Sequence, residues 1–261
     1  MQNNIINITS TSNETIKYFI SLNDKKTRMN AKRFIVEGYH LVNEASKTNL
    51  LEAIISTDEK ELKKINNVKR YLVNDAIINK IATTKNPQNI LGIVKMLDHN
   101  ITNLLPIIKG NKTKLIMLDD VNDPGNLGTI IRTAAGLGYD GIIMSPNTVD
   151  LYNEKVIRST QGIGFHMNIV NRDLKELIPN LKEEEIPVYG TKVEYGTDIR
   201  TLKRRDKEKY ALIMGNEGRG VDSDILDMCD KFIYIELNHE VESLNVAIAA
   251  SILLYELSRR D

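Results

Sequence analysis

The stretch from Ala211 to Leu257 constrains the fold of this chain more than any other part of it. Two short apolar runs, Ala211–Met214 and Phe232–Ile235, are typical of buried parallel strands. Each run leads into a turn or loop rich in glycine or polar residues, and an apolar helix from about Leu244 to Leu257 closes the stretch. Strand ends that meet a helix N-terminus are the usual ligand site of an α/β fold. The pattern therefore predicts an α/β domain with a binding site here.

Composition limits the class of protein. A chain of 261 residues with 41% apolar residues can fill one large core or two modest ones. No apolar run reaches the ~18 residues that a membrane span needs, and the N-terminus lacks the pattern of a secretory signal. The single cysteine, Cys229, excludes a disulfide framework, and the four histidines show no metal spacing. We expect a soluble, cytoplasmic protein with no bound metal and no membrane contact.

Charge is distributed unevenly, although the formal net charge is zero. Residues 1–110 carry 16 Lys and Arg against 10 Asp and Glu, whereas residues 111–261 carry 19 against 25. The segment Asp24–Arg33 alone has five basic residues and one acidic residue. A basic half joined to an acidic half favours a module that binds a polyanion such as nucleic acid, but a chance asymmetry of solvated charges explains it equally well.

Strands and helices alternate along the chain, which predicts two α/β domains. The first covers residues 1–98, residues 99–113 form a linker broken by Pro106 and Gly110, and the second covers residues 114–261. The strands expected in the first domain are Phe34–Val36, Leu51–Ser56, Arg70–Val73 and Ile90–Lys95. Those expected in the second are Leu115–Leu118, Gly141–Met144, His166–Val170, Pro187–Thr191, Tyr210–Met214 and Phe232–Ile235. The second set predicts a mainly parallel sheet covered on both faces.

Two glycine-rich segments are poor candidates for nucleotide sites. The G-x-G-x-x-G pattern at Gly136–Gly141 follows a helix and precedes a strand, the reverse of a dinucleotide fingerprint, so it indicates a helix end and a tight turn. GNEGRGV, from Gly215, lacks the Gly-Lys-Ser/Thr that completes a phosphate-binding loop. Its glycines still allow backbone amides to approach a ligand closely.

Five polar residues have both a structural and a functional interpretation. Asn126 stands where the N-cap of a helix Leu127–Leu137 is expected, after the turn signal Asp-Pro-Gly-Asn. Arg132 lies inside that apolar helix, where it is functional or simply reaches solvent or an ion-pair partner. Ser243 and Asn245 begin the C-terminal helix, where they cap it or bind a ligand. Glu217, between glycines, is solvated or part of a site.

Three motifs, taken in order, resemble those of the SpoU/TrmH branch of the SPOUT methyltransferases, which modify RNA on the ribose 2′-oxygen. NDPGNLGTIIRTA is similar to the first motif of the family, LIMGNEGRGV to the second and IELNHEVESLNVAIAASILLYE to the third. Together they organise nearly all of residues 115–257. Residues 1–97, with RFIVEGYHLV and NPQNILGIVKM, are similar to the small RNA substrate-binding domain that is often fused in front.

The resemblance implies a fold and a cofactor. The family fold is a mainly parallel α/β sheet with a deep trefoil knot near the C-terminus, an exception among proteins. The knot binds S-adenosylmethionine, mostly through backbone groups, and proteins of this family are homodimers with the C-terminal helix in the interface. The cofactor-binding residues implied here are Thr191, Gly215, Ile235, Leu237 and Leu244.

The resemblance also implies a reaction that needs no metal. A ribose hydroxyl must be held in line with a sulfonium methyl, so positioning supplies much of the acceleration. Arg132 is the central catalytic residue in the family pattern. Because a guanidinium has a pKa above ~12, we favour Arg132 as a ligand of the adjacent phosphate and of the developing oxyanion. A deprotonated arginine acting as the base is the alternative. The residues that would orient these groups are Asn126, Glu217, Ser243 and Asn245.

The third motif departs from the family pattern, which usually begins Ile-Pro-Met and has a glycine three residues before Glu-Ser-Leu-Asn. Glu236 replaces the proline, Leu237 the methionine and His239 the glycine, so we expect the loop Glu236–Val241 to differ in shape. The segment Arg200–Lys209, with six basic and two acidic residues, either flanks an RNA path or is a solvated loop.

The sequence therefore predicts an S-adenosylmethionine-dependent ribose 2′-O-methyltransferase that acts on structured RNA, ribosomal rather than transfer RNA. A non-catalytic RNA-binding protein that retains the fold is the alternative, and methyl transfer to labelled RNA separates the two. A nucleotide-dependent dehydrogenase is excluded, because no glycine-rich turn lies between a strand and a helix.

Overall fold

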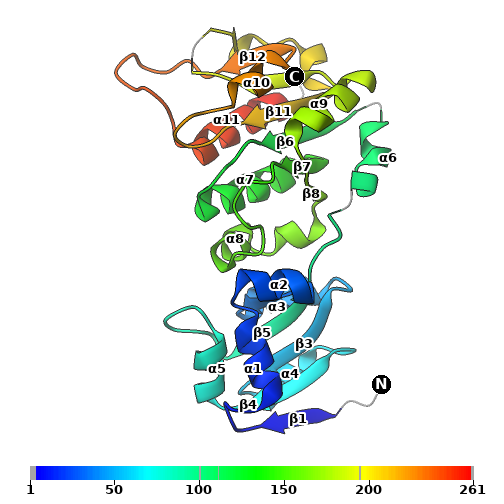
Figure 1. Ribbon diagram of the computed structural model, residues 1–261, viewed down its shortest axis with the longest axis vertical. Coiled ribbons are helices and arrows are strands. Elements are labelled where there is room, and N and C mark those ends of the chain that lie inside the picture. The colour runs from blue at the N-terminus through cyan, green and yellow to red at the C-terminus, as the bar shows by residue number, and fades with distance from the viewer. Residues whose placement is uncertain (1–3, 100, 111, 194, 260–261) are drawn as a thin grey trace. The chain divides into compact units, whose positions relative to one another are not determined.

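The computed structural model describes residues 4–99, 101–110, 112–193 and 195–259. The chain divides into two compact units, and most of their helices and strands are labelled in Figure 1. The first consists of Met1–Asp98 and Tyr152–Phe165, and the second of His99–Leu151 and His166–Asp261. The sequence pattern did not indicate that Tyr152–Phe165, which follows a strand of the second unit, packs with the first.

The first unit is built on a mixed five-stranded sheet with the order β1-β4-β3-β5-β2. β4 runs parallel to β1 and β3, whereas β5 is antiparallel to β3 and β2. The strands are β1 (Ile5–Ile8), β2 (Arg33–Glu37), β3 (Leu51–Ser56), β4 (Lys69–Val73) and β5 (Ile90–Lys95). The expected strands are confirmed to within a residue at each end, and β1 is an additional edge strand.

The helices of the first unit cover this sheet. They are α1 (Glu14–Ser21), α2 (Lys25–Ala31), α3 (Tyr39–Ser46), α4 (Glu59–Lys64), α5 (Asp75–Ile81) and α8 (Glu154–Thr160). Apolar side chains of α1 and α5 pack on alternate residues of β3, β4 and β5, as the two-residue period of a strand requires. The segment around α8 packs at β2, where the ring of Phe34 lies 4.7 Å from that of Tyr152 and 6.1 Å from that of Phe165.

The second unit is built on a seven-stranded sheet with the order β10-β12-β9-β11-β6-β7-β8, in which every pairing is parallel. The strands are β6 (Lys114–Leu118), β7 (Gly141–Met144), β8 (Ile169–Asn171), β9 (Val188–Thr191), β10 (Thr197–Asp198), β11 (Tyr210–Met214) and β12 (Lys231–Tyr234). The mainly parallel sheet is confirmed, with β10 added at one edge. The expected start of a strand at His166 is wrong, because that residue ends a 3₁₀ turn, η2 (Ile163–His166).

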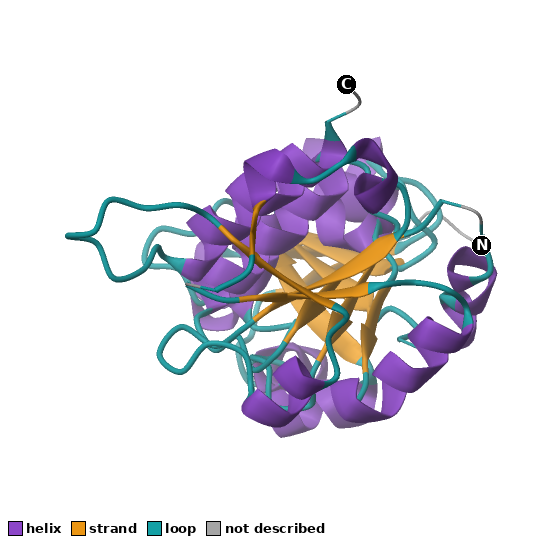
Figure 2. Cartoon of the chain, turned by 90° about the horizontal axis from the view of Figure 1, so that it is seen from above, coloured by secondary structure: helices purple, strands orange, loops and turns teal. Residues whose placement is uncertain are grey.

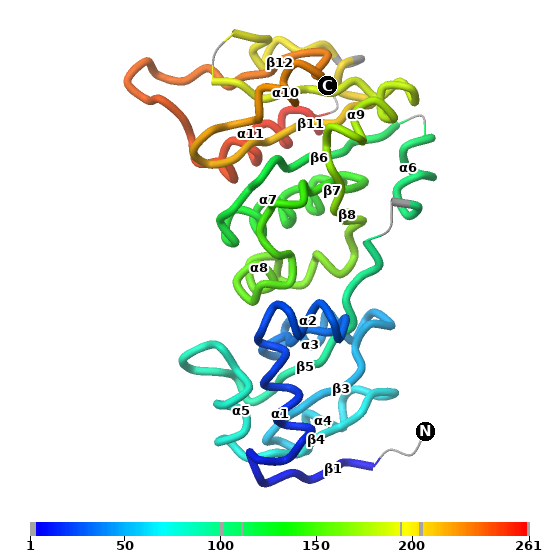
Figure 3. Tube along the Cα trace, viewed as in Figure 1, coloured from blue at the N-terminus to red at the C-terminus, as the bar shows by residue number. Residues whose placement is uncertain are grey.

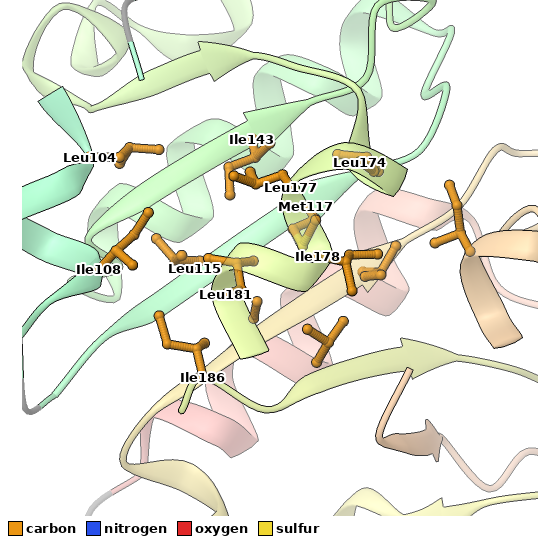
Figure 4. Packing of buried hydrophobic residues seen from close by; sticks show 14 of the residues in the cluster. Leu104, Ile108, Leu115, Met117, Ile143, Leu174, Leu177, Ile178, Leu181 and Ile186 are labelled. Atoms are coloured by element: carbon orange, nitrogen blue, oxygen red, sulfur yellow. The ribbon is translucent and has the colours of Figure 1, made fainter. Parts of the chain in front are cut away.

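Helices cover both faces of this sheet (Figure 2). They are α6 (Leu105–Ile108), α7 (Pro124–Gly136), α9 (Leu174–Glu183), α10 (Ser223–Asp227) and α11 (Val246–Ser258), with 3₁₀ turns η1 (Ile101–Asn103), η3 (Ile199–Thr201) and η4 (Arg204–Lys207). On one face, α6, α9 and α10 pack on Leu115, Met117 and their neighbours (Figure 4). The intervening residues of these strands, also buried, point to the opposite face, where α7 packs against α11. The segment 99–113 therefore contributes a helix to this core.

The first turn of α7 corrects one expectation. The N-cap is Asp123, whose carboxylate accepts a hydrogen bond from the backbone N–H of Asn126 (2.8 Å). Pro124 is then the first helical residue, a position that proline favours because it needs no N–H there. Asn126 is therefore inside the helix, which frees its side chain for other contacts. The expected helix end is confirmed, with Gly138 in the left-handed region (φ 73°).

A long loop joins β12 to α11 and positions the site (Figure 3). The loop ends at Asn245, which caps α11 by accepting hydrogen bonds from the N–H groups of Ala247 (2.9 Å) and Ile248 (3.2 Å). The helix itself is fixed to the sheet by two tyrosines. The hydroxyls of Tyr139 and Tyr210 are 2.7 Å apart, and that of Tyr139 donates to the carbonyl oxygen of Leu254 (3.1 Å).

Candidate active site

A cavity of about 1020 Å³ lies where β9, β11 and β12 end and α11 begins. It is lined by Thr191 at the end of β9, by the loop after β11 and by the loop before α11. The residues expected to bind the cofactor all line it: Thr191, Gly215, Ile235, Leu237 and Leu244. The volume suits a ligand of the size of S-adenosylmethionine. The structure thus brings together residues that are more than 50 positions apart in the sequence.

The wall beside β11 is a closed loop that depends on glycine. A Cβ atom on Gly215 would overlap the backbone of Gly220. Asn216 and Gly220 exchange two backbone hydrogen bonds of 3.0 Å, and the side chain of Asn216 accepts from the N–H of Gly218 (2.9 Å). A side chain at Gly215 would therefore force the loop apart, because only glycine allows the backbone of residues 215 and 220 to approach this closely.

Three of the expected catalytic residues form one hydrogen-bonded chain. The side-chain amide of Asn126 donates to Glu217 (2.9 Å), and that of Asn245 donates to Asn126 (3.0 Å). Glu217 also accepts from the backbone N–H groups of Asn122 (3.1 Å) and Asp123 (3.0 Å). Asn245 is thus both a helix cap and a member of the site. The chain of bonds fixes the three motif segments to one another.

These bonds set the charge of Glu217. Partial burial acts to raise its pKa, but the hydrogen bonds from Asn126 and from the backbone of Asp123 and Asn122 outweigh it, so the pKa of Glu217 lies below its ordinary value. The interpretation of Glu217 as a merely solvated residue is wrong. Its carboxylate is a fixed acceptor at neutral pH.

The other two expected catalytic residues stand apart from this chain of bonds. Ser243 lines the cavity and is exposed, and it does not cap α11. Arg132 is exposed on α7 and, within the described part of the chain, is neither a lining residue nor a partner in a hydrogen bond or ion pair. The next residue, Thr133, lies 3.3 Å (Oγ1 to Oγ) from Ser251 of α11. Among the residues that the structure describes, Arg132 therefore has no ion-pair partner, and it lies next to the contact between α7 and α11.

An ion-pair cluster that the motifs did not indicate anchors the glycine loop. Arg219 pairs with Asp120 (2.7 Å), Asp222 (3.1 Å) and the buried Asp119 (3.5 Å). Burial is the main cause that raises the pKa of Asp119, and the backbone N–H of Asp222 and the Arg219 guanidinium oppose it. The signal available in the sequence was the Asp-Asp pair directly after the apolar run of β6. The cluster ties the loop to the end of β6.

The basic segment Asp24–Arg33 presents less free charge than its composition indicates. Arg28 is buried and donates to the carbonyl oxygen of Asn23 (2.7 Å), and Arg33 pairs with Glu52. Lys25, Lys26 and Lys32 remain exposed. In the described residues we find no group of three or more His, Cys, Asp or Glu that could hold a metal ion. Among the same residues, every helix is too short or too polar to cross a membrane.

Comparison with known proteins defines the class. Residues 113–255 match the SpoU rRNA Methylase family, and residues 13–92 match the MRM3-like substrate binding domain. The chain belongs to the SpoU rRNA methylase family, and its cofactor is S-adenosylmethionine. The expected family and its enzymatic character are confirmed.

Individual relatives agree with this assignment over almost the whole chain. The 23S rRNA (guanosine(2553)-2′-O)-methyltransferase RlmP of Bacillus subtilis is 36% identical over 253 residues, which cover 96% of this chain and 98% of RlmP. The AdoMet-bound rRNA methyltransferase from Sinorhizobium meliloti has a TM-score of 0.86 at 28% identity, with 97% of each chain covered. The SpoU methyltransferase AviRb from Streptomyces viridochromogenes, in complex with AdoMet, shares the fold (TM-score 0.83, 23% identity, 94% of this chain and 97% of AviRb).

Proposed function

We propose that this protein methylates a ribose 2′-hydroxyl of ribosomal RNA in the cytoplasm. The observation that carries the proposal is the bonded chain Glu217–Asn126–Asn245 at the cavity. These residues come from three motifs, and a non-catalytic RNA-binding protein would have no need to hold them together. RlmP, the relative at 36% identity, is named for 23S rRNA and for a guanosine, so that RNA is the substrate to test first.

The cavity supports binding of S-adenosylmethionine within a knotted segment. Gly215 lets the loop close against Gly220 at the cavity wall, and the apolar residues Ile235, Leu237 and Leu244 also line the cavity. Thr191 closes the end of β9 by donating its hydroxyl to the carbonyl oxygen of Ile213 (2.9 Å). We place the trefoil knot in the segments that form these walls.

The bound cofactor supplies a methyl group on a positively charged sulfur, which leaves as a neutral thioether. To accept that methyl group, the ribose hydroxyl would have to lose its proton. Arg132 binds the adjacent phosphate and the developing oxyanion, and that phosphate takes the proton. Glu217, Asn126 and Asn245 fix the loops around the reacting atoms, and Ser243 lies beside them at the cavity wall. Positioning then supplies much of the acceleration.

A homodimer completes the site in this proposal. Ile248, Ile252 and Tyr255 of α11 are 52%, 37% and 56% exposed and recur at helical spacing on one face. An exposed apolar stripe of this kind fits a second copy of the chain. Arg132 lies beside α11 and outside its own cavity, so we place its action at this interface. In this proposal the domain expected over residues 1–98 binds the RNA through its exposed lysines.

The test is methyl transfer from labelled S-adenosylmethionine to unmodified 23S rRNA transcripts, with transfer RNA as the comparison. Arg132→Ala should lower kcat by about 100-fold or more, the loss typical of one oxyanion donor. Calorimetry should show S-adenosylhomocysteine binding unchanged in Arg132→Ala and lost in Leu244→Arg, because only the second change enters the cavity.

Three outcomes would contradict the proposal. Full activity of Arg132→Ala would remove its catalytic role. Methylation of a base rather than the ribose, shown by a product that alkali still cleaves, would exclude the 2′-oxygen. A folded dimer that binds RNA but transfers no methyl group would support the non-catalytic alternative.

A further inference from the structure

An exposed ion-pair cluster lies beside the cavity wall and plays no part in the reaction described above. Arg200 pairs with Asp198 (2.5 Å) and with Glu236. Glu236 is the residue that stands where the family pattern has a proline. Hydrogen bonds from Arg200 lower the pKa of Asp198, and those to Asp198 and Glu236 raise the pKa of Arg200, so the pairing favours the charged forms of Asp198 and Arg200.

Strand register explains why these residues meet. β10 pairs with β12 in parallel, with Asp198 opposite Tyr234. Arg200 and Glu236 each lie two residues beyond that pair, so both emerge at the same edge of the sheet. Asp198 accepts a hydrogen bond from the backbone N–H of Arg200 (2.9 Å), and the intervening Ile199 is buried. Arg200 therefore projects from a fixed turn, whereas Glu236 lies on a loop.

The same register fixes what the loop presents to the cavity. Ile235 and Leu237 line the cavity, while Glu236 between them is exposed and pairs with Arg200. Tyr234, the last residue of β12, also lines the cavity, so the pair of Glu236 with Arg200 lies within a run of residues that form the cavity wall. Within the described residues, the backbone N–H of Glu236 donates to no other backbone group. The ion pair with Arg200 is therefore a contact that holds Glu236 from outside the loop.

We propose that Arg200 is a positioning residue for the cofactor. Its pair with Glu236 fixes the backbone between Ile235 and Leu237 and so keeps both apolar side chains at the cavity wall. A proline at position 236 would restrict the backbone of this segment through its ring and would need no partner residue. In this chain the ion pair between Arg200 and Glu236 restricts it instead. The inference rests on the proposed placement of S-adenosylmethionine in that cavity.

The experiment measures the affinity for S-adenosylhomocysteine by calorimetry on the purified full chain. Arg200→Ala should raise Kd about two- to fivefold, the range expected for an exposed ion pair, and Arg200→Lys should recover part of the loss. Lys203→Ala, which removes a charge three residues away, should leave Kd unchanged. In about 1 M NaCl, which screens exposed charges, wild type and Arg200→Ala should converge.

A second substitution tests whether Arg200 acts on the cofactor through Glu236. Glu236→Pro alone should bind like wild type, and Arg200→Ala combined with Glu236→Pro should recover the wild-type Kd. In methyl-transfer assays, Arg200→Ala should raise KM for the cofactor and leave KM for RNA unchanged. Equal Kd values for Arg200→Ala and wild type would overturn the inference. A loss of affinity that persists when Arg200→Ala is combined with Glu236→Pro would also overturn it. A wild-type protein that binds no S-adenosylhomocysteine would instead contradict the proposed function.

Discussion

Glu217 shows how a single residue gains its role from the fold. In the sequence it is an acidic residue between glycines, and in the structure it accepts hydrogen bonds from one side chain and two backbone groups. Its residue type could be predicted as part of a site, because the motif named it. Its partners could not, since Asn126 lies 91 positions away and the expected N-cap role would have occupied that side chain.

Acid should remove the contribution of Glu217 to stability. Its folded-state pKa lies below the ordinary value of 4.5, so the ionised carboxylate stabilises the folded protein above about pH 4.5 and this contribution is lost as the pH falls through the lower folded value. Glu217→Gln should lower Tm at pH 7 by about 2–4 °C, the effect of one lost hydrogen bond in a protein of this size. The difference from wild type should narrow as the pH falls below about 4.5.

Thermal unfolding followed by circular dichroism from pH 7 to pH 3 measures this difference. Glu240→Gln, at another exposed loop position, is the matched control and should track wild type throughout. A difference in Tm between Glu217→Gln and wild type that widens in acid would contradict the lowered pKa of Glu217.

At the scale of elements, apolar runs determined what the sequence could predict. β5 and β7 match their expected ranges to the residue, because each is an uninterrupted apolar run between polar segments. β10 escaped prediction, since Thr197 and Asp198 carry no strand signal and pair only because β12 lies beside them. The ion pair between Arg200 and Glu236 could not be predicted either, because it also depends on β10 lying beside β12. Non-local register cannot be obtained from local pattern.

The attachment of α11 to the sheet leads to a prediction about two tyrosines. Tyr139 donates to Leu254, so Tyr210 must donate to Tyr139, and burial raises the pKa of both hydroxyls. Tyr139→Phe leaves the buried Tyr210 hydroxyl without an acceptor and should cost about 1–3 kcal/mol. Tyr210→Phe leaves the bond to Leu254 intact and should cost only about 0.5–1.5 kcal/mol.

Urea unfolding of both variants gives the two free energies of unfolding. The two variants are matched, because each removes one hydroxyl from the same buried site and leaves the aromatic ring. A larger loss for Tyr210→Phe would mean that the donor order is reversed.

At the scale of the whole molecule, the proposed dimer interface on the exposed face of α11 leads to a prediction about the oligomeric state. Ile252→Arg places a charge in the middle of the apolar stripe, where burial against a second copy would leave it unpaired. We expect the mass in solution to fall from that of a dimer to 29.6 kDa, with methyl transfer lost because Arg132 then lacks its interface. Light scattering after size exclusion measures the mass.

Ile6→Arg is the control for this experiment, since Ile6 is a similarly exposed isoleucine on β1 of the first unit. It should leave both mass and activity unchanged. A dimer that survives Ile252→Arg would remove α11 from the interface, and a wild-type monomer would remove the interface itself.

The path of the chain through its first unit has a consequence for synthesis. The ring of Phe34 contacts those of Tyr152 and Phe165. During synthesis the N-terminal part of a chain leaves the ribosome first. The nascent N-terminal unit therefore keeps an open aromatic surface until residue 165 has emerged, by which time β6, α7 and β7 have been made. Completion of the first unit is in this way timed by translation of part of the second, so a prematurely terminated chain would release a first unit that is still unfinished.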